Sequence, residues 1–217
     1  MNRNLLRGVR LALIGAVTAG ALSACAPLLV GGAIVGGSMV ATDRRTSGAQ
    51  VEDEVIELKA GNRLRESIGE RGQVNATSYN RVMLLTGVVN DAADKALAEQ
   101  VVSRIDNVQS VVNELSLGLP RSITGRSNDA LLTTKVKASF IDAKDLFSNA
   151  LKVVTSQGVV YLMGRVTERE ANRAAEVARG VSGVQKVVKV FEIISEAELA
   201  NTQPKPASTS ASAPKSP

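Results

Sequence analysis

The chain of 217 residues contains no histidine, no tryptophan and one cysteine, and its aromatic residues are three phenylalanines and two tyrosines. The usual nitrogen and sulfur ligands of transition metals are therefore missing, so we expect neither a metal site nor a cofactor. Catalytic Ser–His and Cys–His pairs are excluded for the same reason, and we expect that the protein is not an enzyme. The scarcity of aromatic rings for base stacking argues against nucleic acid as a partner.

The first 42 residues contain no acidic side chain, and none of residues 11–41 is charged. An arginine-bearing stretch, residues 1–10, precedes an apolar run from Leu11 to Ala21, which is typical of a signal peptide. The tetrad "LSAC", Leu22 to Cys25, follows this run and resembles the lipobox of bacterial lipoproteins. The resemblance implies that residues 1–24 are removed as a lipoprotein signal peptide and that Cys25 is acylated.

The segment after the cysteine stays apolar but reads "APLLVGGAIVGGSMVA", with four glycines in 16 residues. It is short for a membrane span and weak as a helix. We expect residues 25–49 to form an apolar, Gly-rich tether close to the membrane, which the lipid anchor at Cys25 holds. Ala26 stands where an aspartate favours the inner membrane in enterobacterial lipoproteins. That resemblance implies an outer-membrane location, with the protein facing the periplasm.

Charge is distributed unevenly along the rest of the chain. Removal of the signal peptide lowers the formal net charge from +5 to +2, so the basic pI does not point to nucleic acid. Residues 50–118 carry a net charge of −4, whereas residues 119–196 carry +4. Either the two halves pack against each other or one of them faces an anionic surface.

The two halves repeat one pattern. Gly87 in "LLTGVV" corresponds to Gly164 in "YLMGRV", and Val108 in "NVQSVV" corresponds to Val184 in "GVQKVV". A repeat of this length indicates two small domains. We expect the domains at residues 50–118 and 127–196, a linker at 119–126 and a disordered Pro-, Ser- and Ala-rich tail at 197–217. Domains of about 70 residues have marginal cores, so we expect the two to be coupled.

Each half predicts the order helix, strand, strand, helix, strand. In the second half, Ser127 or Asn128 can cap a helix that ends near Ala143. "ALKVVTS" and "VVYLMGRV" are β-rich and joined by "QG", a hairpin signal. Thr167 and Glu170 form a capping box ahead of the next helix, and "VQKVVKVFEII" is the last strand. We expect Gly87 and Gly164 to serve backbone geometry where the second strand turns towards the helix.

This αββαβ unit resembles the BON domain, above all in "SNDALLTTKVKASF", "VYLMGRVTEREA" and "VSGVQKV". Two such units behind a lipobox resemble the dual-BON outer-membrane lipoproteins, which are relatives of a soluble, osmotically induced periplasmic protein. The resemblance implies an α+β fold, in which each domain packs a small three-stranded mixed sheet against two helices. It also implies support of envelope integrity and binding of anionic phospholipid, phosphatidylglycerol or cardiolipin, through the first helix of the second domain.

The first helix of the second half has residues suited to that role. Leu132, Val136 and Phe140 fall on one face. Leu131, Lys135 and Asp142 lie about 100° away on a second face. Leu131 can insert among acyl chains while a lysine meets a phosphate. The candidate phospholipid-binding residues are Leu131, Lys135, Lys137 and Ile141.

Other interpretations remain open at this point. Leu131 could instead pack against the first domain and leave the lysines solvated. The edges of small sheets could receive an added strand, which would make the protein a periplasmic chaperone or an accessory factor of the outer-membrane protein assembly machinery. A structural tether to the cell wall is a third alternative.

The tetrad that ends in Cys25 yields the first testable prediction. We expect Cys25→Ala to leave an unprocessed precursor or to release the protein from the outer-membrane fraction, because both cleavage and acylation need the thiol. Cell fractionation and mass spectrometry of the mature protein measure both effects. An unmodified thiol at Cys25 in mature protein would contradict the lipoprotein interpretation.

Overall fold

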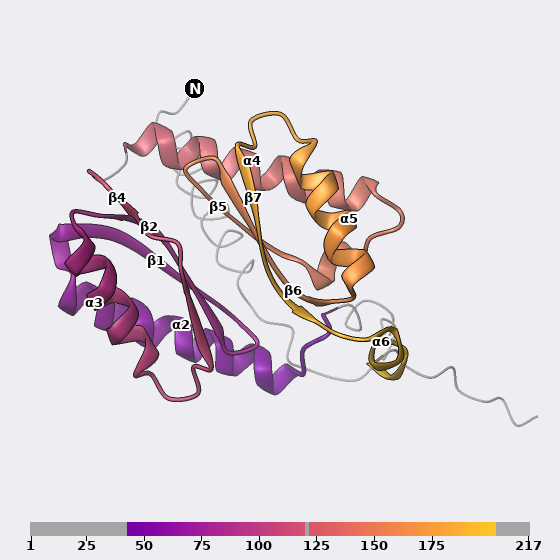
Figure 1. The fold of residues 1–217 in the computed structure, drawn as a ribbon, viewed down its shortest axis with the longest axis horizontal. Helices are drawn as coiled ribbons and strands as arrows, with labels where there is room; N and C mark the ends of the chain where they lie inside the picture. Colours follow the sequence, from indigo (N-terminus) through magenta and orange to yellow (C-terminus); the bar gives the residue numbers. More distant parts are fainter. Residues whose placement is uncertain (1–42, 120–121, 203–217) are drawn as a thin grey trace, which may run out of the picture. The chain divides into compact units, whose positions relative to one another are not determined.

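The structure, a computed structural model, describes residues 43–119 and 122–202. The expected signal peptide, Cys25, most of the tether and the end of the tail lie outside the described residues. The described residues form two successive αββαβ domains (Figure 1). The predicted α+β class, with a small mixed sheet and two packed helices in each domain, is confirmed. In these ranges, none of the helices has the length and apolar character needed to cross a membrane.

In the first domain, β1 pairs antiparallel with β2, and β2 pairs parallel with β3 and with the short β4. Helices α2 and α3 cover one face of this sheet (Figure 1). The elements are α2 (Ser47–Ser67), a 3-10 turn η2 (Gly69–Arg71), β1 (Gly72–Tyr79), β2 (Val82–Val89), α3 (Ala92–Ser103), β3 (Ser110–Asn113) and β4 (Ser116–Leu117).

The second domain repeats this topology, because β5 pairs antiparallel with β6 and β6 pairs parallel with β7. Helices α4 and α5 cover one face of the sheet. The elements are α4 (Ile123–Asp142), a 3-10 turn η3 (Ser148–Ala150), β5 (Lys152–Ser156), β6 (Val159–Val166), α5 (Glu168–Arg179), β7 (Lys186–Ile193) and a C-terminal α6 (Glu196–Thr202).

Each domain begins its sheet with a two-residue hairpin loop. Asn80 and Arg81 form the first loop, and Gln157 and Gly158 form the second. All four residues have positive φ, between 48° and 73°, as the tight loops that match the twist of antiparallel strands require. The hairpin predicted from "QG" is therefore confirmed, and the first domain makes the same turn without a glycine.

The helices of each domain bury an apolar stripe against their own sheet. The predicted stripe of α4 is confirmed, since Leu132, Val136 and Phe140 are all buried in the core of the second domain. Ile56, Ala60 and Leu64 are the equivalent buried residues of α2. The capping box of α5 is also confirmed: the Thr167 side chain accepts from the Glu170 amide, and the Glu170 carboxylate accepts from the Thr167 amide.

The opposite faces of the two sheets share a third apolar cluster. Tyr79 and Leu84 from the first sheet lie in it together with Tyr161 and Met163 from the second, and each is at most 4% exposed. Polar contacts join the domains as well, because Lys152 donates to Glu57 at 2.8 Å and to the carbonyl of Ser78 at 3.0 Å. Both domains contribute residues to this shared core, which gives the expected coupling between them a physical basis.

Residues 43–49 do not behave as the end of a tether, which corrects the expected boundary. Helix α2 begins at Ser47, capped by Thr46, and the two residues before the cap are tied to the folded domains. Arg44 donates to both carboxylate oxygens of Glu170 at 2.7 Å and to the carbonyl of Arg165 at 2.9 Å. Arg45 donates at 2.7 Å to Asp53, a buried carboxylate on α2.

Three other sequence predictions are wrong in detail. Helix α4 is capped by Ser122 rather than by Ser127 or Asn128, so its first turns occupy the expected linker. The single last strand expected in the first half is interrupted between β3 and β4, where the Leu115 side chain enters the core of the first domain. Residues 197–202 of the expected disordered tail belong to helix α6, which buries Leu199, and Glu198 accepts a hydrogen bond from Arg165.

The two glycines that we expected at the strand-to-helix turns lie inside strands β2 and β6. Gly87 has a φ of 121°, and a Cβ atom there would lie 1.9 Å from the carbonyl oxygen of Gln73. At Gly164 a Cβ atom would lie 2.5 Å from the carbonyl oxygen of Ala150. Both glycines are therefore required by the close approach of a neighbouring backbone.

The Arg44–Glu170 ion pair yields the second prediction. Both side chains are buried, with 8% and 4% of their surfaces exposed, so Arg44→Ala leaves a buried carboxylate without its partner. We expect a loss of about 3 kcal/mol in the free energy of unfolding, measured with urea. Lys59→Ala is the matched control, because it breaks the exposed Lys59–Asp106 pair and is expected to cost less than about 1 kcal/mol.

The same variant has a defined pH dependence. Burial acts to raise the pKa of Glu170, but the hydrogen bonds from Arg44 and from the Thr167 amide outweigh it and lower the pKa from its ordinary value. A carboxylate with a lowered pKa in the folded state contributes stability above its ordinary titration range and loses it as the pH falls. The difference in the free energy of unfolding between the parent and Arg44→Ala should therefore shrink below about pH 4. If the loss of stability caused by Arg44→Ala does not change with pH, the lowered pKa of Glu170 is not due to Arg44.

A third prediction separates the strand glycines from a helical one. Gly87→Ala should lower the free energy of unfolding by about 2 kcal/mol or more, because the new methyl group meets backbone atoms that cannot move aside. Gly61→Ala should raise stability by about 0.5–1 kcal/mol, since nothing lies within 4 Å of its Cβ position in the interior of α2. Thermal and urea unfolding measure both, and equal effects at the two sites would exclude close backbone packing as the cause.

Candidate functional site

Helix α4 presents a side opposite to its buried stripe that no other described element covers. Leu131 is 62% exposed and Ile141 is 70% exposed. Leu131 therefore does not pack against the first domain, which removes that alternative. At 100° per residue, Ala138 and Ile141 lie within about 80° of Leu131, so the three form one strip about 15 Å long.

Basic side chains border this strip on both sides. Lys135 lies about 40° from Leu131 in one direction around the helix, and Lys137 about 120° in the other. Both lysines are exposed, and neither has an ion pair with another residue in the described part of the chain. We call the surface made by Leu131, Lys135, Lys137, Ala138 and Ile141 the outer face of α4. Asp142, at the end of the helix, lies about 20° from Leu131 around the helix, so this face also carries an exposed acid.

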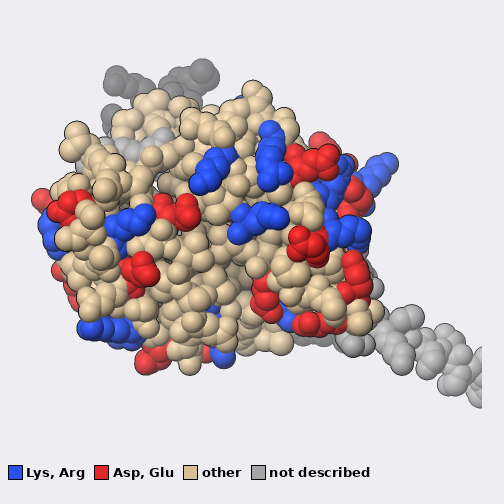
Figure 2. Space-filling view, viewed as in Figure 1, with Lys and Arg blue, Asp and Glu red and all other residues tan. Residues whose placement is uncertain are grey.

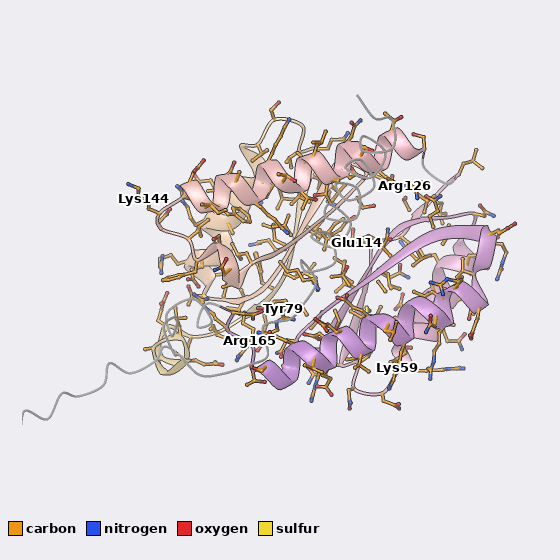
Figure 3. All side chains as sticks on the ribbon, turned by 180° about the vertical axis from the view of Figure 1, so that it is seen from behind. Lys59, Tyr79, Glu114, Arg126, Lys144 and Arg165 are labelled. Atoms are coloured by element: carbon orange, nitrogen blue, oxygen red, sulfur yellow. The ribbon has the colours of Figure 1, made fainter. Side chains whose placement is uncertain are left out.

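Further basic residues lie near the two ends of the helix. In Figure 3, Arg126 lies near the first turns of α4, and Lys144 follows its last turn. Basic side chains also gather over the β7 region of the second domain in Figure 2, where Lys186 and Lys189 are exposed. The positive charge that the sequence assigns to this half is therefore present on its surface.

A carboxylate that the sequence analysis missed fixes α4 against its sheet. Asp129 accepts hydrogen bonds at 3.0 Å from the backbone amides of Gln157 and Gly158, the two loop residues of the β5–β6 hairpin. In the first domain, Asp53 of α2 accepts from the amides of Asn80 and Arg81 in the same way. The signal was available in the sequence, because Asp53 and Asp129 occupy equivalent positions of the repeat.

Asp53 also accepts hydrogen bonds from side chains. Burial acts to raise its pKa, but hydrogen bonds from the Ser78 hydroxyl, the Arg81 amide and the Arg45 side chain hold the pKa below its ordinary value. Asp53 is therefore a structural carboxylate, fully used by protein donors. Among residues 43–119 and 122–202 no group of three or more His, Cys, Asp or Glu side chains could hold a metal ion.

The candidate residues thus fall into two groups. Leu131, Lys135, Lys137 and Ile141 share the exposed side of one helix, with apolar and cationic groups next to one another. Gly87 and Gly164 lie inside strands and take no part in this surface. A helix face of this kind can bury apolar side chains in a lipid interface while its lysines contact anionic groups.

Comparisons with known proteins agree with the repeat seen in the structure. The BON domain family model matches residues 52–118 and 128–195. The outer membrane lipoprotein DolP of Haemophilus influenzae is 39% identical over 176 residues, which cover 80% of this chain and 90% of that protein. Neither similarity indicates a catalytic activity.

Two further relatives are more distant. The 21 kDa hemolysin of Actinobacillus pleuropneumoniae is 31% identical over 154 residues, covering 70% of this chain and 79% of that protein. The osmotically-inducible protein Y of Escherichia coli is 26% identical over 159 residues, which cover 70% of this chain and 77% of that protein. The chain belongs to the BON-domain family, as an outer-membrane lipoprotein with two BON domains in tandem.

Proposed function

We propose that this lipoprotein, anchored through acylated Cys25 and facing the periplasm, binds anionic phospholipid through the outer face of α4 and thereby supports envelope integrity. The observation that carries the proposal is an exposed apolar strip between lysines that have no ion-pair partner in the described chain. An apolar strip bordered by cations is the pattern of helices that lie in the interface of an anionic membrane.

The expected binding is weak. Complete burial of a leucine or isoleucine side chain contributes about 1.5–3 kcal/mol, and each basic residue near an anionic surface contributes about 1 kcal/mol. Part of this gain is lost in ordering the protein on the membrane. Weak binding is sufficient, because an acyl anchor at Cys25 already keeps the protein at a membrane. The domain then has only to select where on that membrane it rests.

Comparison of the two first helices supports the second domain as the lipid-binding one. Val55 and Lys59 of α2 occupy the positions of Leu131 and Lys135 of α4 in the repeat. Lys59, however, forms an ion pair with Asp106 at 3.7 Å, and the position of Asp106 is held by Ser182 in the second domain. Lys135 therefore lacks the acidic partner that Lys59 has, and Lys135 is the lysine that is proposed to contact phosphate.

The chaperone alternative receives less support from the sheet edges. The described edge strand β7 carries exposed Lys186 and Lys189, and lysines on an edge oppose the addition of another strand. The edge strand β1 bears the polar residues Gln73, Asn75 and Thr77. If the protein does not bind lipid, we would instead infer a role as an accessory of outer-membrane protein assembly.

The fourth prediction tests the outer face of α4. A soluble protein that starts at Thr42 should sediment with vesicles that contain phosphatidylglycerol or cardiolipin and should ignore neutral vesicles. Leu131→Glu should abolish sedimentation without unfolding the domain, because Leu131 is 62% exposed and its replacement adds a charge that the anionic surface repels. Added salt should weaken the binding of the parent, since surface charges are screened.

Two variants control this experiment. Leu58→Glu introduces the same charge at a leucine of similar exposure, 68%, on α2 of the first domain, and it should bind as the parent does. Val136→Glu should unfold the second domain, because Val136 is fully buried. If Leu131→Glu binds as well as the parent, or if the parent shows no preference for anionic vesicles, lipid recognition by α4 is wrong.

A further inference from the structure

A groove with a volume of about 460 Å³ lies in the first domain between α3 and β3. On the strand side it is lined by β3 and by the two residues before it. Val108 and Val111 provide the apolar part of this side, because both pack against the core of the first domain. The helix side consists of the exposed side chains of Ala96, Glu99, Gln100 and Ser103.

The outer side of β3 offers backbone groups that no described strand uses. The strand order is β1-β2-β3, so within the described ranges β3 is an edge strand that pairs with β2 alone. The amide of Gln109 donates at 3.0 Å to the carbonyl of Arg81, directly before β2. Successive residues of a strand direct their backbone groups to opposite sides, so those of Ser110 and Val112 face away from β2. The backbone of another extended chain can pair with such groups.

The second domain carries bulky cations at the equivalent edge. Arg179 and Lys186 occupy the positions of Ser103 and Ser110 in the repeat, and both side chains are exposed. Lysine on an edge strand opposes the addition of another strand. The first domain has two small hydroxyl side chains at these positions, so its edge remains accessible where the edge of β7 is obstructed.

The charge of the groove indicates the kind of partner that fits it. Glu99 is the charged residue among the described groove residues, and its side chain is exposed. The amide of Asn113 donates to this carboxylate at 3.0 Å and to the carbonyl of Lys95 at 2.9 Å, which fixes the end of β3 against α3. Residues 50–118 carry a net charge of −4. A carboxylate on a domain of negative charge favours a partner with a basic side chain.

We propose that this groove binds an extended segment of another polypeptide, which adds a strand to the outer edge of β3. An aliphatic side chain of the segment packs against Val108 and Val111, and a basic side chain lies near Glu99. In this mode of recognition, backbone hydrogen bonds provide affinity and pockets for alternate side chains provide specificity. None of these residues belongs to α4, so the groove can be occupied whether or not the second domain rests on lipid.

Two peptides of one sequence test the addition of a strand. The full-length protein in neutral phosphatidylcholine nanodiscs is titrated with fluorescently labelled Thr-Val-Thr-Lys-Thr-Val-Thr, whose valines and lysine share one face when the peptide is extended. The second peptide is N-methylated at the lysine and at the threonine after it. Successive amides face opposite sides, so each edge of this peptide loses a donor. We expect its dissociation constant, measured by fluorescence anisotropy, to be about tenfold higher, as for the loss of one or two hydrogen bonds.

One position of β3 supplies a variant and its control. Ser110→Pro removes an amide that faces away from β2 and places a ring on the edge, so it should weaken binding of the unmethylated peptide about tenfold. Proline is tolerated at such positions of edge strands. Ser110→Ala keeps the amide and should bind as the parent does. Circular dichroism verifies that both variants are folded, and the comparison of the two peptides on the parent protein depends on neither variant.

A further variant tests the preference for a basic side chain. Glu99→Gln removes the charge but keeps an acceptor for Asn113. It should weaken binding of the lysine peptide about two- to threefold, as for an exposed ion pair. Binding of a peptide with glutamine in place of lysine should not change. An equal effect on the two peptides would show that Glu99 does not select the lysine.

Two results overturn the addition of a strand to β3. One is equal affinity for the N-methylated and unmethylated peptides, and the other is unchanged affinity of Ser110→Pro. If the unmethylated peptide does not bind at all, the groove is not a peptide site. Lipid binding by α4 is measured separately with anionic vesicles, and none of these results bears on it.

Discussion

The contact between the two sheets is the constraint on which the remaining structure depends. Each sheet carries its helices on one face, and its other face is apolar and is covered by none of the described helices. The only described surface that covers it is the equivalent face of the neighbouring domain. Burial in this contact raises the pKa of Tyr161 to about 12, as expected for a phenol removed from water. Pairing of the domains therefore completes both cores, and it leaves the outer sides of the first helices available for other contacts.

Polar contacts at the border of this core determine how the domains meet. An apolar contact between two small sheets is not directional, whereas bidentate and charge-assisted hydrogen bonds require one geometry. Arg44 reaches Glu170, Asn80 donates to Glu192 at 2.6 Å, and Lys152 reaches Glu57. The Glu170 carboxylate accepts hydrogen bonds from Arg44 and also completes the N-terminal cap of α5. One side chain therefore makes both a long-range and a local contact. The segment that leads from the expected membrane anchor is thereby tied to the lipid-binding domain of the proposal.

Much of the fold could be read from local patterns, and the errors have identifiable causes. The α4 stripe, the "QG" turn and the Thr167 capping box depend on residues close together in the sequence, and all three are found as expected. The start of α4 was misplaced because Ser122 caps a helix as well as Ser127 does, so the sequence offers two starts. The roles of Arg44 and of α6 depend on partners more than 30 residues away, which periodicity cannot identify.

Divergence between the two repeats explains how one scaffold came to carry two kinds of surface. The carboxylate that ties the first helix to the hairpin loop is kept in both domains, as Asp53 and Asp129. Around it the first domain keeps its charges paired, because Lys59 has Asp106 and Arg81 has Glu52. The second domain has Ser182 and Gly158 at the positions of Asp106 and Arg81. The first difference leaves Lys135 without the acidic partner that Lys59 has, and the second removes the side chain that crosses from the hairpin loop to the first helix in the first domain.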